Sequence, residues 1–501
     1  MNKIFRLLLV FSIPAAVLLL SNCKKDQFGS NNLVFSTDTL TFDTVFTTLG
    51  STTRYFKVFN TSSKAVTIES IRLSHLTGDQ YRINVDGVTG DQFTNVEIPA
   101  KDSIYVFVEV TVNPNSAATP FVIIDDVEFI TSASSSKVHL QAFGQNAHFH
   151  YGEDIKSGTV YWTNDLPHVI ISRQNDSIPG VFVRCNASLN IGPGCKIFFA
   201  GNSAIIVEGS LYAQASSWQD SIVFQGARLE TFYEDKPGQW SGIIFLRDTN
   251  QSNACASTGI FDHCVITESS YGINAGSGLT SNLNKFLGVA GRPEILVQNT
   301  IIKNSQFNAI NGFNAKVTAN NSIFYTAGEH LLKLGLGGEY NFTHCTLVNN
   351  GSRYISHEKE ALLLSNFVSD GTNAFLNPLK TTFTNCVLYG SLENEISFNN
   401  FNPNPFDLTN FDNAFHYSDV KTRQDTFELF AAVKDNMLFN EDPKFKKADA
   451  GNFTPWDSIG YFSPLIDYAP TGSSEDIFGT MRPVSKTTNA NKFDVGAVET
   501  R

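Results

Sequence analysis

A run of four titratable residues, HEKE at positions 357–360, is the first candidate for acid–base chemistry in the sequence. Elimination beside a carboxylate needs a proton acceptor and a neutralising charge, and His357 with Lys359 could supply both. The run lies in a segment that interrupts a repeat, where charged residues are usually solvated. We therefore interpret it as a surface loop and assign no catalytic residue in the chain.

Two shorter phrases resemble fragments of polysaccharide-degrading sites. Polygalacturonase-like enzymes combine paired aspartates with Asn-Thr-Asp, Gly-His-Gly and Arg-Ile-Lys phrases, and the region that would carry them has none. The adjacent pair Asp125 and Asp126 falls elsewhere, among alternating strands, and is interpreted as a solvated turn. Arg292, followed by proline, resembles the arginine–proline phrase of pectate lyases, but a second arginine at the required spacing is missing.

Aromatic side chains offer a different chemistry, because a flat apolar face with a polar rim suits a pyranose ring. Trp162, Trp218 and Tyr233 are the candidate ligand-binding residues. Tyr233, within the phrase TFYED, has the composition of a loop and is the best of the three.

The cysteines do not indicate a metal site. Cys23 lies near the start, and the other six form no Cys-x-x-Cys pair, so we predict no structural zinc. An oxidising compartment would permit disulfides, with fifteen possible pairings among six thiols. The six are Cys185, Cys195, Cys255, Cys264, Cys345 and Cys386.

One short phrase recurs and indicates the elements that hold these residues. Its copies are HCVI at 263–266, NTII at 299–302, NSIF at 321–324, HCTL at 344–347 and NCVL at 385–388. The central copies are about 22 residues apart, which is the length of one three-stranded rung of a parallel β-helix, and the longer outer intervals indicate inserted loops. A single rung cannot bury its own inner face, so the rungs must stack.

Period two then assigns the faces of the repeated strand. The fourth position is always large and apolar, so it points inward together with the small second position, and the cysteines there are packed hydrophobes rather than reactive thiols. The first position, His or Asn, lies outward or at a corner, where successive side chains could form a ladder. His263 and His344 are three rungs apart, roughly 14 Å, which is too far for one metal ion.

The strands that precede the repeat give a resemblance to a known fold. The phrases VFVRC at 181–185, LNIGPGCKIFF at 189–199 and IIVEGSLYA at 205–213 are similar to the early rungs of pectate-lyase-like right-handed parallel β-helix proteins. This resemblance implies a solenoid over 155–440. The later phrases EDPKF, DIFGTMR and DVGAVE resemble the terminal segment of bacterial surface β-helix proteins, which implies a capping segment over 441–501.

The region that precedes the solenoid has a different pattern, in which short strands of alternating apolar and polar residues are separated by turns. Phrases such as YFKVFN at 55–60 and VHLQAFG at 138–144 resemble Hydin-like immunoglobulin-like domains of bacterial surface proteins. The resemblance implies an immunoglobulin-like β-sandwich over 33–147, of the kind that serves as a spacer or adhesion module. The predicted fold class is therefore all-β, a sandwich followed by a solenoid.

The pattern of residues 1–22 is typical of an export signal. Lys3 and Arg6 precede an apolar run at 7–20 that is shorter than a membrane span. The phrase LSNC at 20–23 resembles a lipobox, although Asn22 departs from its usual Gly or Ala. This implies a signal peptide at 1–22, diacylation of Cys23 and a tether at 23–32. Lys24, at the second mature position, resembles the outer-membrane rather than the inner-membrane sorting signal of Gram-negative lipoproteins, which implies an outer-membrane lipoprotein facing the periplasm or the medium.

Composition limits the functions that remain. A formal net charge of −12 disfavours binding to phosphate backbones, so nucleic acid is not expected as a partner. We predict no cofactor and no metal, and we make no prediction of oligomeric state. The favoured hypothesis is a lipoprotein whose β-helix binds glycan or another surface polymer without cleaving it. The alternatives are a polysaccharide lyase or glycoside hydrolase with an unfamiliar site, and an adhesion or envelope-scaffold protein.

Overall fold

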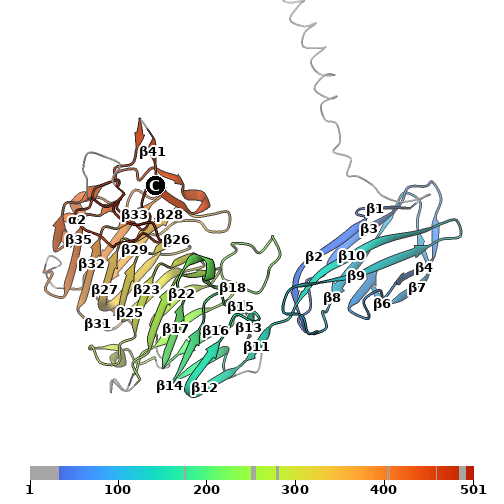
Figure 1. Ribbon diagram of the computed structural model, residues 1–501, viewed down its shortest axis with the longest axis horizontal. Coiled ribbons are helices and arrows are strands. Elements are labelled where there is room, and N and C mark those ends of the chain that lie inside the picture. Colours follow the sequence, from blue (N-terminus) through green and yellow to red (C-terminus); the bar gives the residue numbers. More distant parts are fainter. Residues whose placement is uncertain are drawn as a thin grey trace, which may run out of the picture. The chain divides into compact units, whose positions relative to one another are not determined.

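The computed structural model is mostly β-structure, with 54% of the described residues in strands and 4% in helices. It describes residues 33–173, 177–249, 255–277, 281–402, 404, 407–458, 460–484 and 492–500. The predicted signal peptide, the tether and Cys23 lie outside these residues. Within them, none of the helices is long and apolar enough to cross a membrane. The chain divides into two compact units after Asn146 (Figure 1).

The N-terminal unit, here called the sandwich, consists of two five-stranded sheets. One sheet has the order β1 (Leu33–Phe35), β3 (Arg54–Asn60), β8 (Ser103–Val110), β5 (Tyr81–Val85) and β6 (Val88–Gly90). The other has the order β2 (Thr39–Phe46), β10 (Ser135–Gln145), β9 (Phe121–Ile130), β4 (Val66–Leu73) and β7 (Gln92–Ile98).

Alternation along each strand builds a single core between these sheets. In β8 the side chains of Val106 and Val108 are buried, whereas Tyr105 and Glu109 point outward. Because successive side chains of a strand point to opposite faces, one apolar face of each sheet is enough to form this core. The members of the core belong to both sheets and form one contiguous cluster.

The pair Asp125 and Asp126 is not the solvated turn that we predicted. Both lie within β9 and are buried. Asp126 forms ion pairs with Lys137 at 2.8 Å and His139 at 2.7 Å on the neighbouring strand β10. Cross-strand partners therefore satisfy a carboxylate that composition alone suggested would be exposed.

The second unit, here called the solenoid, consists of stacked parallel strands in three lanes. One lane is an 11-stranded sheet, here called the flank sheet: β11 (His148–Tyr151), β13 (His168–Ile171), β15 (Lys196–Ala200), β18 (Ile222–Gly226), β21 (Cys264–Thr267), β24 (Ile301–Ser305), β26 (Ile323–Ala327), β28 (Thr346–Asn349), β33 (Val387–Gly390), β36 (Asp419–Val420) and β38 (Leu438–Phe439). The other two lanes share a 15-stranded sheet, and its long strands bend from one lane into the other.

The long strands are β12 (Glu153–Trp162), β14 (Gly180–Ile191), β25 (Asn308–Asn320) and β27 (Leu332–Thr343). The shorter strands of the first lane are β16 (Ala204–Val207), β19 (Gly242–Leu246), β22 (Tyr271–Ser277), β29 (Leu362–Ser365) and β34 (Ile396–Asn399). Those of the second lane are β17 (Ser210–Gln214), β20 (Thr258–Asp262), β23 (Glu294–Gln298), β32 (Leu379–Thr384), β35 (Phe411–His416) and β37 (Val433–Asp435). A small hairpin of β30 (Phe367–Ser369) and β31 (Ala374–Leu376) projects between β29 and β32.

The repeated phrase stacks as its spacing predicted. Ile302 pairs in register with Phe324, and Phe324 pairs with Leu347, on three successive strands of the flank sheet. All three side chains are fully buried. Identical positions of successive rungs thus form one continuous column, and this column belongs to the core of the whole solenoid.

The first position of the phrase is a corner of each rung. His263, Asn299, Asn321, His344 and Asn385 all have left-handed backbone conformations, with φ between 44° and 55°. Asn adopts this conformation more readily than most residues because its short side chain forms local hydrogen bonds. One ladder contact is present, from Asn385 Nδ2 to His344 Nε2 at 2.9 Å.

Aromatic side chains close both ends of the solenoid core. At the first rung, the Trp162 ring stacks against both His150 and His168, with ring-centroid distances of 4.3 and 4.6 Å, and the two imidazoles lie within hydrogen-bond distance of each other. At the last rungs, the short helix α2 (Gln424–Phe430) places Phe427 edge-on against Phe415, 4.8 Å away. We predicted that residues 441–501 would cap the solenoid, but at this end Phe427 covers the core.

The described part of residues 441–501 instead runs along the outer face of the flank sheet. It contains β39 (Phe445–Lys447), the 3-10 turn η3 (Ala448–Ala450), β40 (Asn452–Pro455), β41 (Asp457–Ser458) and β42 (Tyr461–Phe462). Trp218 Nε1 donates to Ile477 O, and His344 Nδ1 lies 3.1 Å from Gly496 O. A separate apolar cluster, including Ile323 and Phe453, fills this interface. The segment therefore covers a side of the stack.

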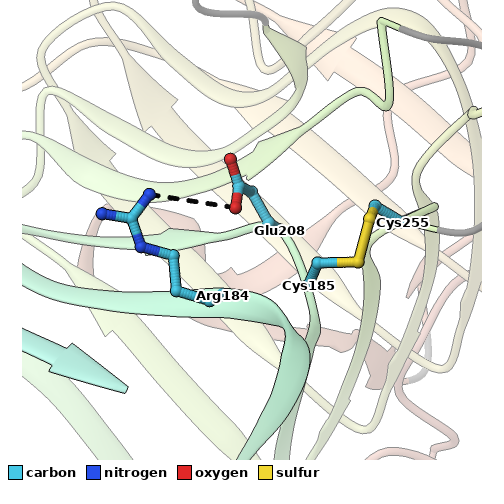
Figure 2. The surroundings of a disulfide bond; sticks show 4 residues. All are labelled: Arg184, Cys185, Glu208 and Cys255. Atoms are coloured by element: carbon cyan, nitrogen blue, oxygen red, sulfur yellow. Dashed lines mark ion pairs between the residues drawn. A yellow bond between two sulfur atoms is a disulfide. The ribbon is translucent and has the colours of Figure 1, made fainter. Parts of the chain in front are cut away.

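A disulfide joins two turns of the solenoid. Cys185, at the bend of β14, is bonded to Cys255, which precedes β20 (Figure 2). Beside it, Arg184 extends toward Glu208 and forms a 2.7 Å ion pair with Asp154. The remaining described cysteines are free and buried, as expected for packed interior residues: Cys195, Cys264, Cys345 and Cys386.

Candidate functional site

A pocket of about 580 Å³ lies between the flank sheet and the segment that covers it. We call it the flank pocket. Its floor is the outer face of β24, β26 and β28, and its walls are the loops at 231–237 and 350–356 and the turn η3. Its lining residues are Asp235, Lys303, Asn304, Tyr325, Thr326, Val348, Asn350, Gly351, Ser352, Arg353, Tyr354, Ala448, Asp449, Ala450 and Phe453.

An ion pair occupies one side of the flank pocket. Lys303 Nζ lies 2.9 Å from Asp235 Oδ1, and Asn304 Nδ2 donates to the same oxygen at 2.6 Å. Burial alone would lower the pKa of Lys303, but Tyr325 and Asp235 together raise it above its ordinary value. Lys303 therefore remains an ammonium group at neutral pH.

Tyr325 forms the centre of the floor. It pairs in register with Lys303 across the parallel strands, and the Lys303 ammonium lies 6.0 Å from the centroid of its ring. Phe453 packs edge-on against this ring at 5.2 Å. Burial raises the pKa of the Tyr325 phenol, although Lys303 opposes the change. The phenol is therefore protonated at neutral pH.

Gly451 allows η3 to approach this floor. A Cβ atom at this position would lie 2.8 Å from the Tyr325 hydroxyl, and the glycine has φ +72°. A residue with a side chain would meet both a close contact and an unfavourable backbone conformation.

Glu268 supports the pocket from behind. Its buried carboxylate accepts hydrogen bonds from the backbone N–H groups of Gly226 at 3.1 Å and Asp235 at 3.0 Å. Burial raises the pKa of Glu268 to about 7, although these two hydrogen bonds oppose the change. Glu268 thereby fixes the loop that presents Asp235.

Hydrogen bonds join the two loops at 231–237 and 350–356 that form the walls of the pocket. Tyr354 Oη donates to Phe232 O at 2.8 Å, and Arg353 Nη2 donates to Glu234 O at 3.2 Å. The guanidinium of Arg353 also lies 4.6 Å from the centroid of the Tyr354 ring. The pocket thus has two tyrosines, two cations and several amide and hydroxyl groups, which together suit a polar ligand with apolar ring faces.

The three predicted aromatic candidates are not brought together. Tyr233 is half-buried in the loop beside the flank pocket, and the Arg228 guanidinium lies 4.0 Å from its ring centroid. Trp218 lies under the covering segment, against Phe478 at 5.7 Å. Trp162 is buried at the first rung. Only Tyr233 is near the pocket, and it is not among the lining residues.

The HEKE run does not form a site either. The His357 side chain is buried, 3.3 Å from Glu395 Oε2, which corrects our interpretation of it as solvated. Lys359 is half exposed and forms a 2.6 Å ion pair with Glu329. The two side chains thus have separate partners, and the Glu395 carboxylate is further engaged by the backbone N–H of Ala361.

The remaining polar candidates also have structural partners. Arg292 Nε donates to Asn314 Oδ1 at 2.6 Å, and burial lowers its pKa. His263 and His344 belong to β21 and β28 corners, which are three strands apart in the flank sheet. Among the described residues, no group of three or more His, Cys, Asp or Glu side chains could hold a metal ion.

Sequence reasoning missed the residues that do converge. Lys303 and Tyr325 each follow the inward position of the repeated phrase by one residue, so period two places both outward on neighbouring strands. That signal was present in the sequence. Asp235 and Arg353 lie in inserted loops, whose spatial neighbours the repeat does not specify.

Comparisons with known proteins add no functional argument. No family model and no curated protein matches the chain. A solved family 123 glycoside hydrolase from Clostridium perfringens aligns over 23% of this chain and 26% of its own, with 10% identity and a TM-score of 0.17. The catalytic unit of a GH87 α-1,3-glucanase from Streptomyces thermodiastaticus aligns over 77% and 75%, with 9% identity and a TM-score of 0.23. A GH87 α-1,3-glucanase catalytic domain solved with nigerose aligns over 77% and 82%, with 10% identity and a TM-score of 0.20. Similarity at these TM-scores carries no argument, so the site is interpreted from its own residues.

Proposed function

We propose that this chain is an outer-membrane-anchored lipoprotein whose solenoid, a right-handed parallel β-helix, binds a glycan in the flank pocket without cleaving it. The observation that carries the proposal is the combination of Tyr325 and Tyr354 with Lys303, Asp235 and Arg353 in one pocket. Pyranose rings present apolar C–H faces and a rim of hydroxyl groups. Tyrosine rings pack against the former, and charged or amide groups hydrogen-bond the latter.

The protonation states favour binding over catalysis. Elimination needs a base, yet Lys303 and Tyr325 both have raised pKa values and hold their protons at neutral pH. Hydrolysis needs two carboxyl groups on either side of the scissile bond. Asp235 is already neutralised by Lys303, and the other acid that lines the pocket is Asp449 on the exposed turn η3.

The cellular location of the protein is a separate part of the proposal. The export signal, the lipobox-like phrase and Cys23 support a lipid anchor, and the Cys185–Cys255 disulfide suits an oxidising compartment. The sandwich, which we propose to be immunoglobulin-like, would act as the spacer between this anchor and the solenoid. Replacing Cys23 with Ala should move the protein from the membrane fraction to the soluble fraction. Retention in membranes would contradict the anchor.

The binding proposal is tested with the purified full-length chain in detergent and a panel of neutral and uronate-containing polysaccharides. Isothermal titration calorimetry measures affinity. We expect Lys303→Met to weaken binding about tenfold, which is about 1.4 kcal/mol, because the pocket loses a partly buried cation and Asp235 keeps only its hydrogen bond from Asn304.

A matched control is Lys316→Met, which removes another ion-paired lysine on the 15-stranded sheet. It should leave affinity unchanged. Equal loss in both variants, or no loss in either, would contradict the flank pocket as the binding site. New reducing ends or unsaturated products in the same mixtures would show cleavage and overturn the non-catalytic part of the proposal.

A further inference from the structure

A second group of aromatic side chains, two exposed tyrosines and a half-buried phenylalanine, lies on the sandwich. Tyr55 on β3 and Tyr105 and Phe107 on β8 point outward from the same sheet, and we call them the aromatic face. The Tyr105 and Phe107 rings are nearly parallel, with an interplanar angle of 13° and centroids 5.8 Å apart. Tyr55 lies 5.4 Å from Tyr105 and is 55% exposed. Large apolar side chains grouped on an outer face usually mark an interaction site.

A groove of about 810 Å³ adjoins this face, and we call it the sandwich groove. Tyr55 and Lys57 belong to both surfaces, because they line the groove and point outward beside Tyr105. Hydroxyl groups are unusually frequent in the lining, which consists of Ser36, Thr37, Thr39, Leu40, Thr41, Thr53, Arg54, Tyr55, Lys57 and Phe59. An aromatic surface therefore continues into a cleft rich in hydrogen-bonding groups.

The charge of the groove is opposite to that of the chain. The chain has a formal net charge of −12, yet the described lining residues include two cations, Arg54 and Lys57, and no acid. An acid outside the lining, Glu109 on β8, accepts a hydrogen bond from the groove residue Thr53. The Lys57 ammonium lies 4.4 Å from the centroid of the Tyr105 ring, which holds the cation beside the aromatic face. This arrangement attracts anions and leaves a ring contact next to the charge.

We propose that the aromatic face and the sandwich groove bind a uronate-bearing polysaccharide, so that the sandwich is a second glycan-binding module of this protein. Pyranose rings pack against Tyr55, Tyr105 and Phe107. A uronate carboxylate pairs with Lys57 or Arg54, and the groove hydroxyls hydrogen-bond the sugar hydroxyls. A protein partner would also use aromatic anchors, but the hydroxyl-rich, acid-free lining favours a polyhydroxylated anion.

The experiment isolates this site from the flank pocket. The full-length chain carrying Lys303→Met is titrated with polygalacturonate and, as a neutral probe, with dextran. Tyr105→Ala in this background should weaken polygalacturonate binding about tenfold, because one of three mutually contacting rings of the face is lost together with the ring contact of Lys57. Tyr105→Phe keeps the ring and should bind within about twofold of its parent. Lys57→Gln should weaken binding and reduce its sensitivity to salt.

Tyr161→Ala is the matched control, since Tyr161 is a 69% exposed tyrosine on β12 of the solenoid. Unchanged binding in Tyr105→Ala, or equal loss in Tyr161→Ala, would overturn the proposal. Dextran bound as tightly as polygalacturonate would overturn the uronate as the ligand class. Complete loss of binding in Lys303→Met alone would assign all binding to the flank pocket and reject a second module. A loss in Tyr105→Ala with no effect of Lys303→Met would support the sandwich site and contradict the flank pocket.

Discussion

The sandwich and the solenoid each bury one large apolar core, but they build it from different pairings. In the sandwich, most strands are antiparallel and a buried residue faces chemically different neighbours from the opposite sheet. In the solenoid, equivalent residues of successive rungs pair in register, so that Phe324 lies between Ile302 and Leu347. The sandwich core is closed on itself, whereas the solenoid core is a stack whose stability is approximately a sum of neighbouring contacts.

The difference also determines where binding surfaces form. The flank sheet is covered by a segment from far along the chain, and the flank pocket lies at the edge of that cover. In the sandwich, the outer face of β3 and β8 keeps Tyr55 and Tyr105 exposed and Phe107 half-buried. One surface is therefore made by long-range packing and the other by alternation within two strands.

Substitutions that create a cavity in either core should cause the largest losses of stability, and the two cores should differ in how far the increase in amide exchange extends. Phe324→Ala and Phe56→Ala both remove fully buried rings and should each cost about 3–5 kcal/mol. We expect Phe324→Ala to increase amide exchange mainly in neighbouring rungs, and Phe56→Ala to increase it throughout the sandwich. Hydrogen exchange measured by mass spectrometry checks this. Uniform exchange across the solenoid in Phe324→Ala would show that its rungs unfold as one unit.

Reduction should affect the solenoid alone. The disulfide between Cys185 and Cys255 joins residues 70 positions apart, and opening it should cost about 2–4 kcal/mol. The thermal transition of the solenoid should shift downward in dithiothreitol, while that of the sandwich remains in place. Dithiothreitol should have no additional effect on Cys185→Ser. A shift of the sandwich transition would contradict the independence of the two units.

The two units should respond to pH in opposite directions. Burial raises the pKa of Glu268 to about 7 from 4.5, so its protonated form is favoured in the folded solenoid and stability falls as pH rises between these values. In the sandwich, burial opposes the change, but Lys137 and His139 lower the pKa of Asp126 from 3.8, so the stability it contributes is lost only as pH falls below about that value. Urea unfolding at pH 5 and 8 should show a loss of about 2 kcal/mol from Glu268 alone, and Glu268→Gln should remove that part. Burial also raises the pKa values of Asp419 and Glu499 to about 7, so the total loss for the solenoid should be larger. The sandwich should instead lose stability between pH 5 and 3. An unchanged loss in Glu268→Gln would assign the effect to other buried acids.

Substitutions of the left-handed residues at the rung corners should cause the smallest loss in the free energy of unfolding. Asn299 has φ 44°, and its side chain donates to Asp262 at 3.0 Å. Asn299→Ala should cost about 1–2 kcal/mol, and Asn299→Gly should recover most of the backbone part of it. The hairpin between β5 and β6 has a left-handed glycine, Gly87, and Gly87→Ala provides the matching change in the sandwich. Chemical denaturation measures both. Equal stability of Asn299→Ala and the parent would show that the corners do not require this conformation.

Much of the solenoid could be predicted from the sequence, because each copy of the repeat has the same pattern of inward and outward positions and therefore the same strand register. The period of the phrase fixed the inward column, and the structure places Ile302, Phe324 and Leu347 on it. The course of residues 441–501 could not be predicted in this way. Its contacts with Trp218 and His344 depend on side chains that share no periodic pattern.

The sites were harder to predict for a related reason. The pair Asp125 and Asp126 was interpreted as a turn because two acids rarely share a buried strand. Asp126 is satisfied by Lys137 and His139 of β10, whereas Asp125 accepts a hydrogen bond from the backbone N–H of Asp126. The aromatic candidates were chosen by residue type, but Trp162 serves as an end cover of the core. In the flank pocket, the outward positions of Lys303 on β24 and Tyr325 on β26 could be predicted from the alternation of side chains along the strands. The position of Asp235 could not, because it lies in an inserted loop.

The covering of the flank sheet has a consequence for biosynthesis. Trp218 and Ile477, whose hydrogen bond helps to fasten the cover, are separated by 259 positions, so early rungs emerge long before the residues that shield them. During synthesis the outward apolar side chains of Ile323 and Val348 remain exposed until the covering segment has been made. The interval is one in which chaperones would be needed, and a chain interrupted within it would expose this face to proteases.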